Sequence, residues 1–246
     1  MNKDIILIFG GDGKIAQEIV KKYLDNDCIV IAVDINKENK NKEFNENKNY
    51  YYYSVDITNV EQLNQLFSRI FNEFGYVTHI ISAAAKVFPS DNNGLYELDF
   101  DEINSSIKLN LISHIYISKI FIPLLKYSNS ANKSITFVSS VNALKSFGLP
   151  IYSSCKSGIF GLVNSNVKLL GNDNIRINSI IPGTVATKED IDNKIDSRFQ
   201  DDTFKNMLAL RKFTSPEDIA DSLYSITHIT KSITGQNIIV DSGQLS

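Results

Sequence analysis

Strand-length apolar runs alternate along the chain with longer segments in which apolar residues recur every three or four positions. The runs are mostly β-branched and lack polar alternation, which is typical of parallel strands that are covered on both faces. Seven runs have this character: residues 5–9, 28–33, 51–55, 77–82, 134–139, 175–181 and 236–240. The alternation predicts βαβ units around a parallel sheet.

Helical spacing marks the segments between these runs. After the first and third strands it is set by Ile15, Ile19, Val20, Tyr23, Val60, Leu63, Leu66, Phe67, Ile70 and Phe74. Longer helices are expected over residues 99–127 and 151–170, and another opens at Ser215 with Pro216 in its first turn. Because crossovers are right-handed, helices should cover both faces. We predict an α/β fold with a doubly wound, Rossmann-like, parallel seven-stranded sheet.

Composition indicates one domain. The chain has 246 residues, 43% of them hydrophobic, with only 12 Gly and 5 Pro, which is enough to bury a large core and excludes collagen-like or disordered chains. Residues 37–49 are rich in Asn and charge and are expected to form an exposed loop. No Pro-, Gly- or Ser-rich linker divides the chain, so we expect a single domain over residues 1–246.

Charge and cysteine content limit the partners. With 25 basic and 28 acidic residues the net charge is −3, so no overall positive field attracts nucleic acid. The apolar start is too short for a signal sequence, and no run approaches 18 apolar residues. Cys28 and Cys155 lack CxxC spacing and favour a reducing compartment. We expect a cytoplasmic protein that binds neither nucleic acid nor membrane. His79, His114 and His228 lack metal-ligand spacing, so no metal site is expected.

A glycine-rich turn, FGGDGKIA, directly follows the first predicted strand. It contains G-x-G-x-x-A at Gly11, Gly13 and Ala16, and G-x-x-G-x-x-A at Gly10, Gly13 and Ala16. Either register gives a tight turn, a backbone without Cβ where pyrophosphate approaches, and a small residue where the helix packs on the strand. Glycine clusters also form plain turns, so the turn alone does not identify a dinucleotide site.

Asp34 follows this turn at the end of the second strand. A carboxylate about 20 residues after the turn accepts hydrogen bonds from the ribose hydroxyls and repels a 2′-phosphate, which favours NAD over NADP. Lys14 and Lys37 are near enough in sequence to reach a phosphate, so NADP stays open.

Tyr152 and Lys156 are four residues apart and therefore share one face of a predicted helix. They follow the fifth strand, which ends in Ser139 and Ser140 at the sheet edge where ligands of open α/β sheets bind. The Tyr-x-x-x-Lys spacing is common on helix surfaces, so it is the position after the fifth strand that makes this pair a candidate site.

Several segments together resemble the short-chain dehydrogenase/reductase family, in the compact single-domain form of 3-oxoacyl carrier-protein reductases. They are the glycine turn, VDIT at 55–58, SAAA at 82–85, NLISHIYISKIFIPLL at 110–125, VSSV at 138–141, YSSCK at 152–156, IRINSIIPGTVAT at 175–187, SPEDIADSLYSI at 215–226 and ITGQNIIVDSG at 233–243. The resemblance covers nearly the whole chain.

The resemblance implies a catalytic tetrad of Asn110, Ser140, Tyr152 and Lys156. Tyr152 would be the acid in reduction and the base in oxidation, and Ser140 would orient the substrate oxygen. A phenol with a pKa of about 10 is a poor base at neutral pH, so the Lys156 ammonium would stabilise its phenolate and lower its pKa. Lys156 would also bind the nicotinamide ribose, and Asn110 would bend its helix and hold a water that connects the lysine to solvent. Ser139 stays an alternative to Ser140, because it matches the commoner spacing to Tyr152.

The resemblance also implies a cofactor site. Asp56 should bond the adenine amino group, although an acid there would equally suit a helix start. Pro182 and Gly183 should pass the nicotinamide, and Thr187 should contact its carboxamide. The full predicted set is Gly10, Gly13, Lys14, Ile15, Asp34, Asp56, Ile57, Ala83, Tyr152, Lys156, Pro182, Gly183 and Thr187.

The chain departs from the family pattern in three places, one of which is the short spacing between Ser140 and Tyr152. The turn has Phe9, Lys14 and Ala16 at family Thr or Gly positions, and Ser82 replaces an Asn that supports the central strand. A substrate lid is expected over residues 185–212. It mixes charged and apolar side chains: Lys188, Glu189, Asp190, Lys194, Asp196, Arg198, Phe199, Phe204, Met207 and Leu208.

We therefore expect an NAD(H)-preferring oxidoreductase that transfers a hydride between a nicotinamide cofactor and a carbonyl or secondary alcohol of a small soluble substrate. The family implies a homo-oligomer, either a dimer or a tetramer. Two alternatives are a non-catalytic dinucleotide-binding module and a nucleotide-sugar-modifying enzyme. The length argues against the second, because that class usually adds a substrate domain.

Overall fold

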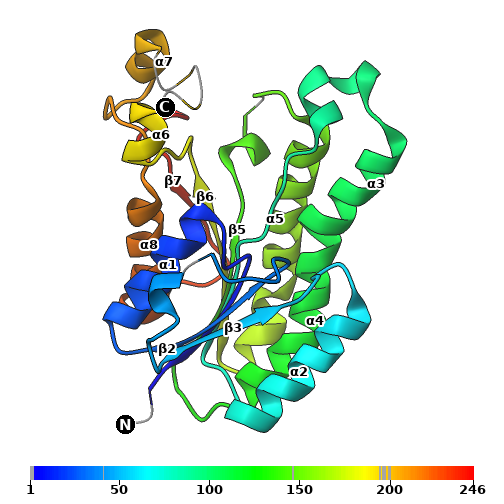
Figure 1. Cartoon of the computed structure of the whole chain (residues 1–246), viewed down its shortest axis with the longest axis vertical. Coiled ribbons are helices and arrows are strands. Elements are labelled where there is room, and N and C mark those ends of the chain that lie inside the picture. The colour runs from blue at the N-terminus through cyan, green and yellow to red at the C-terminus, as the bar shows by residue number, and fades with distance from the viewer. Residues whose placement is uncertain (1–2, 41, 146, 194, 196–197, 199–200) are drawn as a thin grey trace.

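A seven-stranded parallel sheet forms the centre of the protein (Figure 1). The computed structural model describes residues 3–40, 42–145, 147–193, 195, 198 and 201–246. The strands are β1 (Ile5–Phe9), β2 (Ile29–Asp34), β3 (Tyr50–Ser54), β4 (His79–Ser82), β5 (Lys133–Val138), β6 (Ile175–Pro182) and β7 (Asn237–Val240). Their order is β3-β2-β1-β4-β5-β6-β7, which confirms the predicted fold class.

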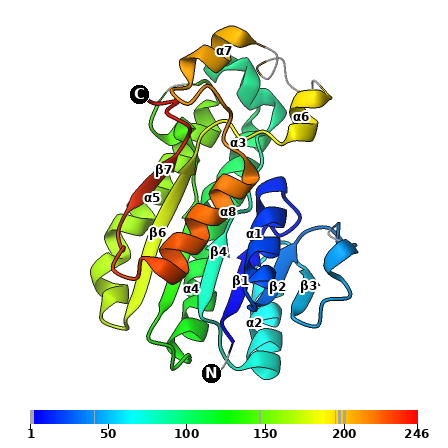
Figure 2. The same cartoon turned by 90° about the vertical axis from the view of Figure 1, so that its left-hand side faces the viewer.

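Helices cover both faces of this sheet (Figure 2). On one face lie α1 (Lys14–Asp25) and α8 (Pro216–Tyr224), and on the other lie α2 (Val60–Phe74), α4 (Ser113–Lys126) and α5 (Pro150–Gly171). Each face has its own hydrophobic cluster, built from alternate strand side chains and one stripe of each helix. In α1, Ile19, Val20 and Tyr23 are fully buried, as their spacing predicted.

The helix predicted over residues 99–127 is interrupted. A first segment, α3 (Phe100–Ile107), continues through a π-helical turn, Lys108–Ile112, into α4. The wider turn contains Asn110 and breaks the regular helical bonding there, as expected for a residue that bends its helix. Asn110 therefore lies on an irregular backbone that faces the end of β4.

By length and composition, the run Phe100–Lys126 is apolar enough to cross a membrane. A core helix passes the same test. Ile117, Phe121 and Leu124 of this run are fully buried and pack in the cluster that contains β4 and β5, which accounts for part of its apolar character.

Short helical turns occupy several connections in the described part of the chain. The 3₁₀ turns are Lys42–Phe44, Pro89–Asn93, Leu95–Glu97 and Val141–Ala143, and a second π turn, Ser225–Ile229, follows α8. Lys42–Phe44 lies in the predicted loop of residues 37–49, of which Asn41 is outside the described residues.

The order of winding reverses at β1, which pairs with both β2 and β4. A crevice forms outside the carboxyl ends of strands at such a point. The glycine turn follows β1, Asp34 ends β2 and Ser82 ends β4, so the chain brings these segments to one edge.

The predicted lid lies above this edge and contains two short helices, α6 (Lys188–Asp192) and α7 (Asp202–Met207) (Figure 1). Ala186, Leu208 and Phe213 form a small cluster separate from the two main ones. The lid thus has a core of its own. Lys194, Asp196 and Phe199 of the predicted lid lie outside the described residues.

Candidate active site

The glycine turn is shaped by close backbone contacts. Gly10 has φ +84°, and a Cβ on it would lie 2.7 Å from the Ala84 Cα. A Cβ on Gly11 would lie 2.8 Å from the Ala32 Cβ. Gly13 then starts α1 without any side-chain cap, so the first backbone N–H groups of the helix stay available to an anion.

A cleft of about 610 Å³ opens beside this turn along the sheet edge. Its lining includes six of the predicted cofactor residues, Gly10, Gly13, Asp34, Asp56, Ile57 and Ala83. An adjoining hollow of about 290 Å³ shares Gly10, Gly13 and Ala83 and adds Lys14, Ile15 and Thr187. Glycine backbone, a helix start and a carboxylate at one edge fit a dinucleotide.

Four residues of the predicted cofactor set line neither hollow: Tyr152, Lys156, Pro182 and Gly183. Pro182 is the last residue of β6. The Gly183 N–H donates to the Val240 carbonyl at 2.9 Å, a distance typical of a hydrogen bond in a sheet. A Cβ on Gly183 would lie 2.7 Å from the Asp241 Cα. The contact of Pro182 and Gly183 with the nicotinamide stays a prediction.

Asp34 is fixed by two neighbours. Its carboxylate accepts from the Asp12 N–H at 3.1 Å and from the Asn36 side-chain amide at 2.9 Å. Asp12 is itself 7% exposed, and its carboxylate accepts from the Tyr52 hydroxyl and the Asn36 amide, both at 2.9 Å. The sequence analysis missed Asp12, although its place inside the glycine turn was a usable signal. The Asn36 amide therefore links the carboxylate of Asp12 to that of Asp34, which lines the cleft.

Lys14 and Thr187 are engaged by the lid. The Lys14 ammonium forms an ion pair with Asp190 of α6. Thr187 caps the same helix, because its hydroxyl accepts from the Asp190 N–H while the Asp190 carboxylate accepts from the Thr187 N–H. Burial raises the pKa of Asp190, but Lys14 and Thr187 outweigh it and the net pKa is lowered. The glycine turn and the lid are thus joined by charge.

Asp56 and Ile57 line the cleft just before α2. The Asp56 carboxylate accepts from the Thr58 N–H and hydroxyl, each at 2.8 Å, just before α2 begins. Asp56 therefore stabilises the start of the helix and also lines the cleft. Its position is compatible with both expected roles, the helix start and the bond to the adenine amino group.

Ser140 and Tyr152 lie together at the carboxyl end of β5. The Ser140 side chain is close enough to the phenol to lower the pKa of Tyr152, and its hydroxyl donates to the Asn142 Oδ1 at 3.1 Å. The Ser139 hydroxyl instead donates to the Lys156 carbonyl at 3.0 Å and is turned toward α5. The structure therefore brings Ser140, and not Ser139, to the phenol.

Lys156 lies beneath the ring of Tyr152. Its Nζ is 5.5 Å from the ring centroid and donates to the Val138 carbonyl at 2.8 Å. The side chain is almost fully buried, and burial lowers its pKa to about 8. The ammonium is directed at the backbone of β5, not at the phenol oxygen.

The pKa of Tyr152 differs from the expectation. Burial raises it to about 12, and the nearby Ser140 side chain offsets only part of that rise. Lys156 does not lower it, because its ammonium is taken by the Val138 carbonyl. At neutral pH the phenol is protonated and can donate.

Asn110 is fixed by backbone contacts. Its side-chain amide accepts from the Lys86 N–H at 2.9 Å and donates to the Lys86 carbonyl at 2.8 Å. It also donates to the Ser106 hydroxyl at 3.0 Å. The amide thereby links the π turn to the loop after β4, and the expected water contact stays a prediction.

Comparison with known proteins gives the family. The family model for short chain dehydrogenases matches residues 4–197. The chain belongs to the short-chain dehydrogenase family.

Relatives of this dehydrogenase match over its whole length. Carbonyl reductase family member 4 of Xenopus laevis is 25% identical over 240 residues, 97% of each chain. The 3-oxoacyl-[acyl-carrier-protein] reductase of Thermotoga maritima is 25% identical, over 97% of this chain and 96% of its own. The family and these reductases make the protein an NAD(P)-dependent oxidoreductase.

Solved structures share the fold. ElxO with NADP bound has a TM-score of 0.88 at 24% identity, covering 99% of each chain. A short-chain dehydrogenase from Leptospira borgpetersenii with bound NAD⁺ has a TM-score of 0.87 at 20% identity, covering 100% of this chain and 94% of its own. The fold therefore accepts either nicotinamide cofactor.

One residue that the sequence analysis missed positions Tyr152 in this short-chain dehydrogenase. Asp91, 1% exposed, accepts from the N–H groups of Ile151 and Tyr152 at 2.8 and 2.9 Å. The preceding Leu149 has a left-handed φ of +59° and supplies no side-chain cap to α5. Asp91, from a distant segment, thus caps the helix that carries the phenol.

Replacing Asp91 with Ala is expected to lower Tm by roughly 2–8 °C, because losing a cap costs about 1–2 kcal/mol in a domain of this size. It should also lower kcat up to about 100-fold while the KM for cofactor changes little, since a shift of about 1 Å in the phenol misaligns proton transfer. Steady-state kinetics and thermal unfolding measure both. Asp91→Asn keeps one acceptor oxygen and should restore part of kcat, and Asp101→Ala, at an exposed acid of α3, is the control. Equal kcat in Asp91→Ala and the control would contradict the role.

His114 contacts Ser82, the residue that stands where the family has Asn. The Ser82 hydroxyl and the His114 Nδ1 are 2.6 Å apart, which links β4 to α4 where the family uses Asn. Burial, together with the charge of Lys156, lowers the pKa of His114 to about 3. The imidazole is therefore neutral in the folded state.

His114 should make the protein less stable in acid. Below pH of about 6.5 the unfolded chain binds a proton at this site that the folded chain excludes, so stability falls by about 1.4 kcal/mol per pH unit as the pH drops toward 3. Between pH 7 and 5 this amounts to about 2 kcal/mol. Denaturant unfolding at these pH values measures the dependence of the free energy of unfolding on pH. In His114→Gln this dependence should be smaller by that amount. An unchanged dependence in the variant would mean that His114 is not the group responsible.

Proposed function

We propose that this short-chain dehydrogenase is an NAD(H)-preferring enzyme that reduces a carbonyl group, or oxidises the matching secondary alcohol, of a small soluble molecule. The observation that carries the proposal is a cleft lined by the glycine turn and the Asp34 carboxylate, together with a protonated Tyr152 close to Ser140 at the carboxyl end of β5.

Reduction uses the phenol as the acid. Nicotinamide supplies the hydride when it is bound, and the Tyr152 hydroxyl donates its proton to the carbonyl oxygen. Ser140 donates to the same oxygen and stabilises the charge that develops there. A pKa of about 12 keeps Tyr152 protonated until that charge appears.

Lys156 stabilises the negative charge that forms on the Tyr152 phenolate when the phenol donates its proton. Its Nζ is 5.5 Å from the ring centroid, in a nearly water-free position where an ammonium acts over a longer range than in solvent. Oxidation of an alcohol runs through the same residues in reverse, with Tyr152 as the base.

The preference for NAD(H) rests on Asp12 and Asp34. In NAD the ribose hydroxyls can donate to the Asp34 carboxylate. The 2′-phosphate of NADP would enter the field of both carboxylates, and Asp12 is further fixed there by Tyr52.

The cell location and assembly follow as proposals. Two free cysteines, Cys28 and Cys155, are buried and suit a reducing, cytoplasmic location. Exposed apolar side chains on α2, α4 and α5 (Phe71, Ile115 and Leu169) suit a homo-oligomer, a dimer or tetramer. Light scattering of the purified protein measures the second point.

The proposed activity is tested by following nicotinamide absorbance with a panel of ketones, sugars and acyl thioesters. Turnover with NADH should exceed turnover with NADPH for the best substrate. A folded protein that binds NADH and turns over none of the panel would count for a non-catalytic module instead.

A further inference from the structure

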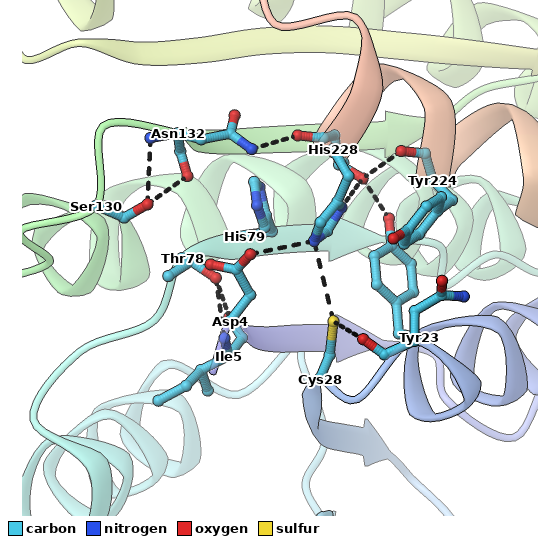
Figure 3. A network of polar contacts seen from close by, with 12 residues as sticks. Asp4, Ile5, Tyr23, Cys28, Thr78, His79, Ser130, Asn132, Tyr224 and His228 are labelled. Atoms are coloured by element: carbon cyan, nitrogen blue, oxygen red, sulfur yellow. Dashed lines mark hydrogen bonds and ion pairs between the residues drawn. The ribbon is translucent and has the colours of Figure 1, made fainter. Parts of the chain in front are cut away.

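A second group of reactive side chains lies at the opposite edge of the sheet from the cleft. Asp4, Cys28, His79 and His228 converge there from four segments of the chain (Figure 3). Asp4 and Cys28 directly precede β1 and β2, His79 begins β4, and His228 lies in the π turn after α8. None of the four has a part in hydride transfer as described above.

The separations between these donor atoms suit one ion. His228 Nε2 is 3.4 Å from the Asp4 carboxylate and 3.9 Å from the Cys28 Sγ. One donor atom from each of Asp4, His79 and His228 lies within 4.8 Å of the other two. Around a tetrahedral zinc ion, two N or O ligands lie about 3.3 Å apart and an N and an S ligand about 3.5 Å apart. Asp4, His79 and His228 therefore need only small side-chain shifts to coordinate one ion. The Cys28 Sγ lies against His228 and would have to turn toward the ion from its contact with the Asn26 carbonyl.

His79 has a ring nitrogen that nothing accounts for. The ring is completely buried, and its Nδ1 is 2.8 Å from the Ser134 hydroxyl. Among the residues that the structure describes, its Nε2 has no hydrogen-bond partner. A buried polar atom without a partner costs free energy and calls for an explanation.

The Asp4–His228 ion pair alone does not supply that explanation. It uses one carboxylate and one imidazole and leaves His79 Nε2 unsatisfied, although the two imidazole ring centroids are only 4.8 Å apart. A cation that accepts lone pairs from both rings satisfies all three side chains.

The surroundings orient both rings as ligands. Thr227 Oγ1 lies 2.8 Å from His228 Nδ1, and Ser134 Oγ stands in the same relation to His79, so each ring is fixed through Nδ1. Histidine ligands of metal ions are usually fixed in this way by an outer hydrogen bond. The π turn that carries His228 is a rare backbone form found often at functional sites.

We propose that Asp4, His79 and His228 bind a divalent ion of the zinc class, with Cys28 as the fourth ligand. Two imidazoles, a carboxylate and a thiolate form a tetrahedral N/O/S set of the kind that zinc takes. On binding, Cys28 loses its proton to solvent, so the carboxylate and the thiolate balance the two charges of the ion.

Charge and access are compatible with this site. The Arg176 guanidinium lies nearby, but it donates to the carbonyls of Ile226 and Thr227. The Asp4 side chain is 33% exposed, which gives an ion a route from solvent. A bound ion would tie the starts of β1, β2 and β4 to the turn after α8, so its role is structural.

Binding is tested on the full chain made without a histidine tag and stripped with a chelator. Zinc added alone should bind at one ion per chain and raise Tm by roughly 5–10 °C at a hundredfold excess over Kd. Cobalt added alone should give the visible bands of a tetrahedral site together with a thiolate charge-transfer band. No binding at this stoichiometry would overturn the proposal, and tetrahedral bands without the thiolate band would overturn the assignment of Cys28.

Variants identify the ligands. Asp4→Asn and His228→Gln alter partly exposed side chains and should fold, as circular dichroism will show, yet lose the zinc-induced rise in Tm. His79→Gln should do the same, and Cys28→Ala should lose the thiolate band. His114→Gln, at the third histidine, and Cys155→Ala, at the other free cysteine, should keep the full zinc and cobalt responses. Retention of zinc binding in Asp4→Asn and His228→Gln would overturn the site.

Discussion

Replacing Tyr152 with Phe is expected to lower kcat/KM by about 10²–10⁴-fold, because the reaction loses its proton donor. NADH binding should stay unchanged, since the substitution removes only the hydroxyl, which lies close to Ser140. Steady-state kinetics on the best carbonyl substrate measure the first effect, and fluorescence titration with NADH measures the second.

The control is Tyr96→Phe, which removes the hydroxyl of an almost fully exposed tyrosine. It should keep full activity. Turnover by Tyr152→Phe at the rate of this control would show that the proton comes from another group, and the proposed mechanism would fail.

Exchanging Asp12 and Asp34 together for Asn is expected to raise the ratio of kcat/KM for NADP(H) over NAD(H) by about 100-fold or more. A carboxylate at about 5 Å from a phosphate costs about 3 kcal/mol at an effective dielectric of 20, which is about two powers of ten. Asparagine keeps a carbonyl oxygen for the hydrogen bonds from Tyr52 and Asn36, so the loop should keep its shape.

Kinetics with both cofactors on the wild type, each single variant and the double variant measure this ratio. Glu38→Gln removes an exposed acid from the same loop and should leave the ratio unchanged. An unchanged ratio in the double variant would mean that Asp12 and Asp34 do not select the cofactor.

The fold could be predicted well because its signals are local. Each strand is a short β-branched run, and the predicted bounds of β1 agree with the structure. Periodicity predicted the long helix as one regular unit, and only the family resemblance implied a bend at Asn110. The structure has a π turn at Lys108–Ile112, in which the Asn110 side chain contacts the Lys86 backbone. Sequence periodicity carries no sign of such a contact.

The arrangement of the site residues could be predicted only where it follows from their spacing in the sequence. Tyr152 and Lys156 share a helix face, and their proximity follows from the four-residue interval. The choice between Ser140 and Ser139 depends on the direction of each hydroxyl, which sequence spacing does not determine. In the structure the Ser139 hydroxyl turns toward α5. The pKa of Tyr152 was also misjudged, because the effect of burial depends on the surrounding fold and the Lys156 ammonium is directed at Val138.

Contacts between residues that are far apart in the sequence were missed. Asp91 lies 60 residues before the Ile151 amide that it caps. Cys28 and His228 are 200 residues apart in the chain and 3.9 Å apart in space. Only the topology of the sheet, which gathers the amino ends of β1, β2 and β4, creates that proximity.

The ion pair between Lys14 and Asp190 couples the glycine turn to the lid, so a change in one affects the other. An anion that takes the Lys14 ammonium also removes a restraint on α6. By reciprocity, any substrate that moves α6 changes the affinity of the turn for that anion by the same factor. The affinities of the two ligands are therefore coupled through a residue that touches neither reacting atom.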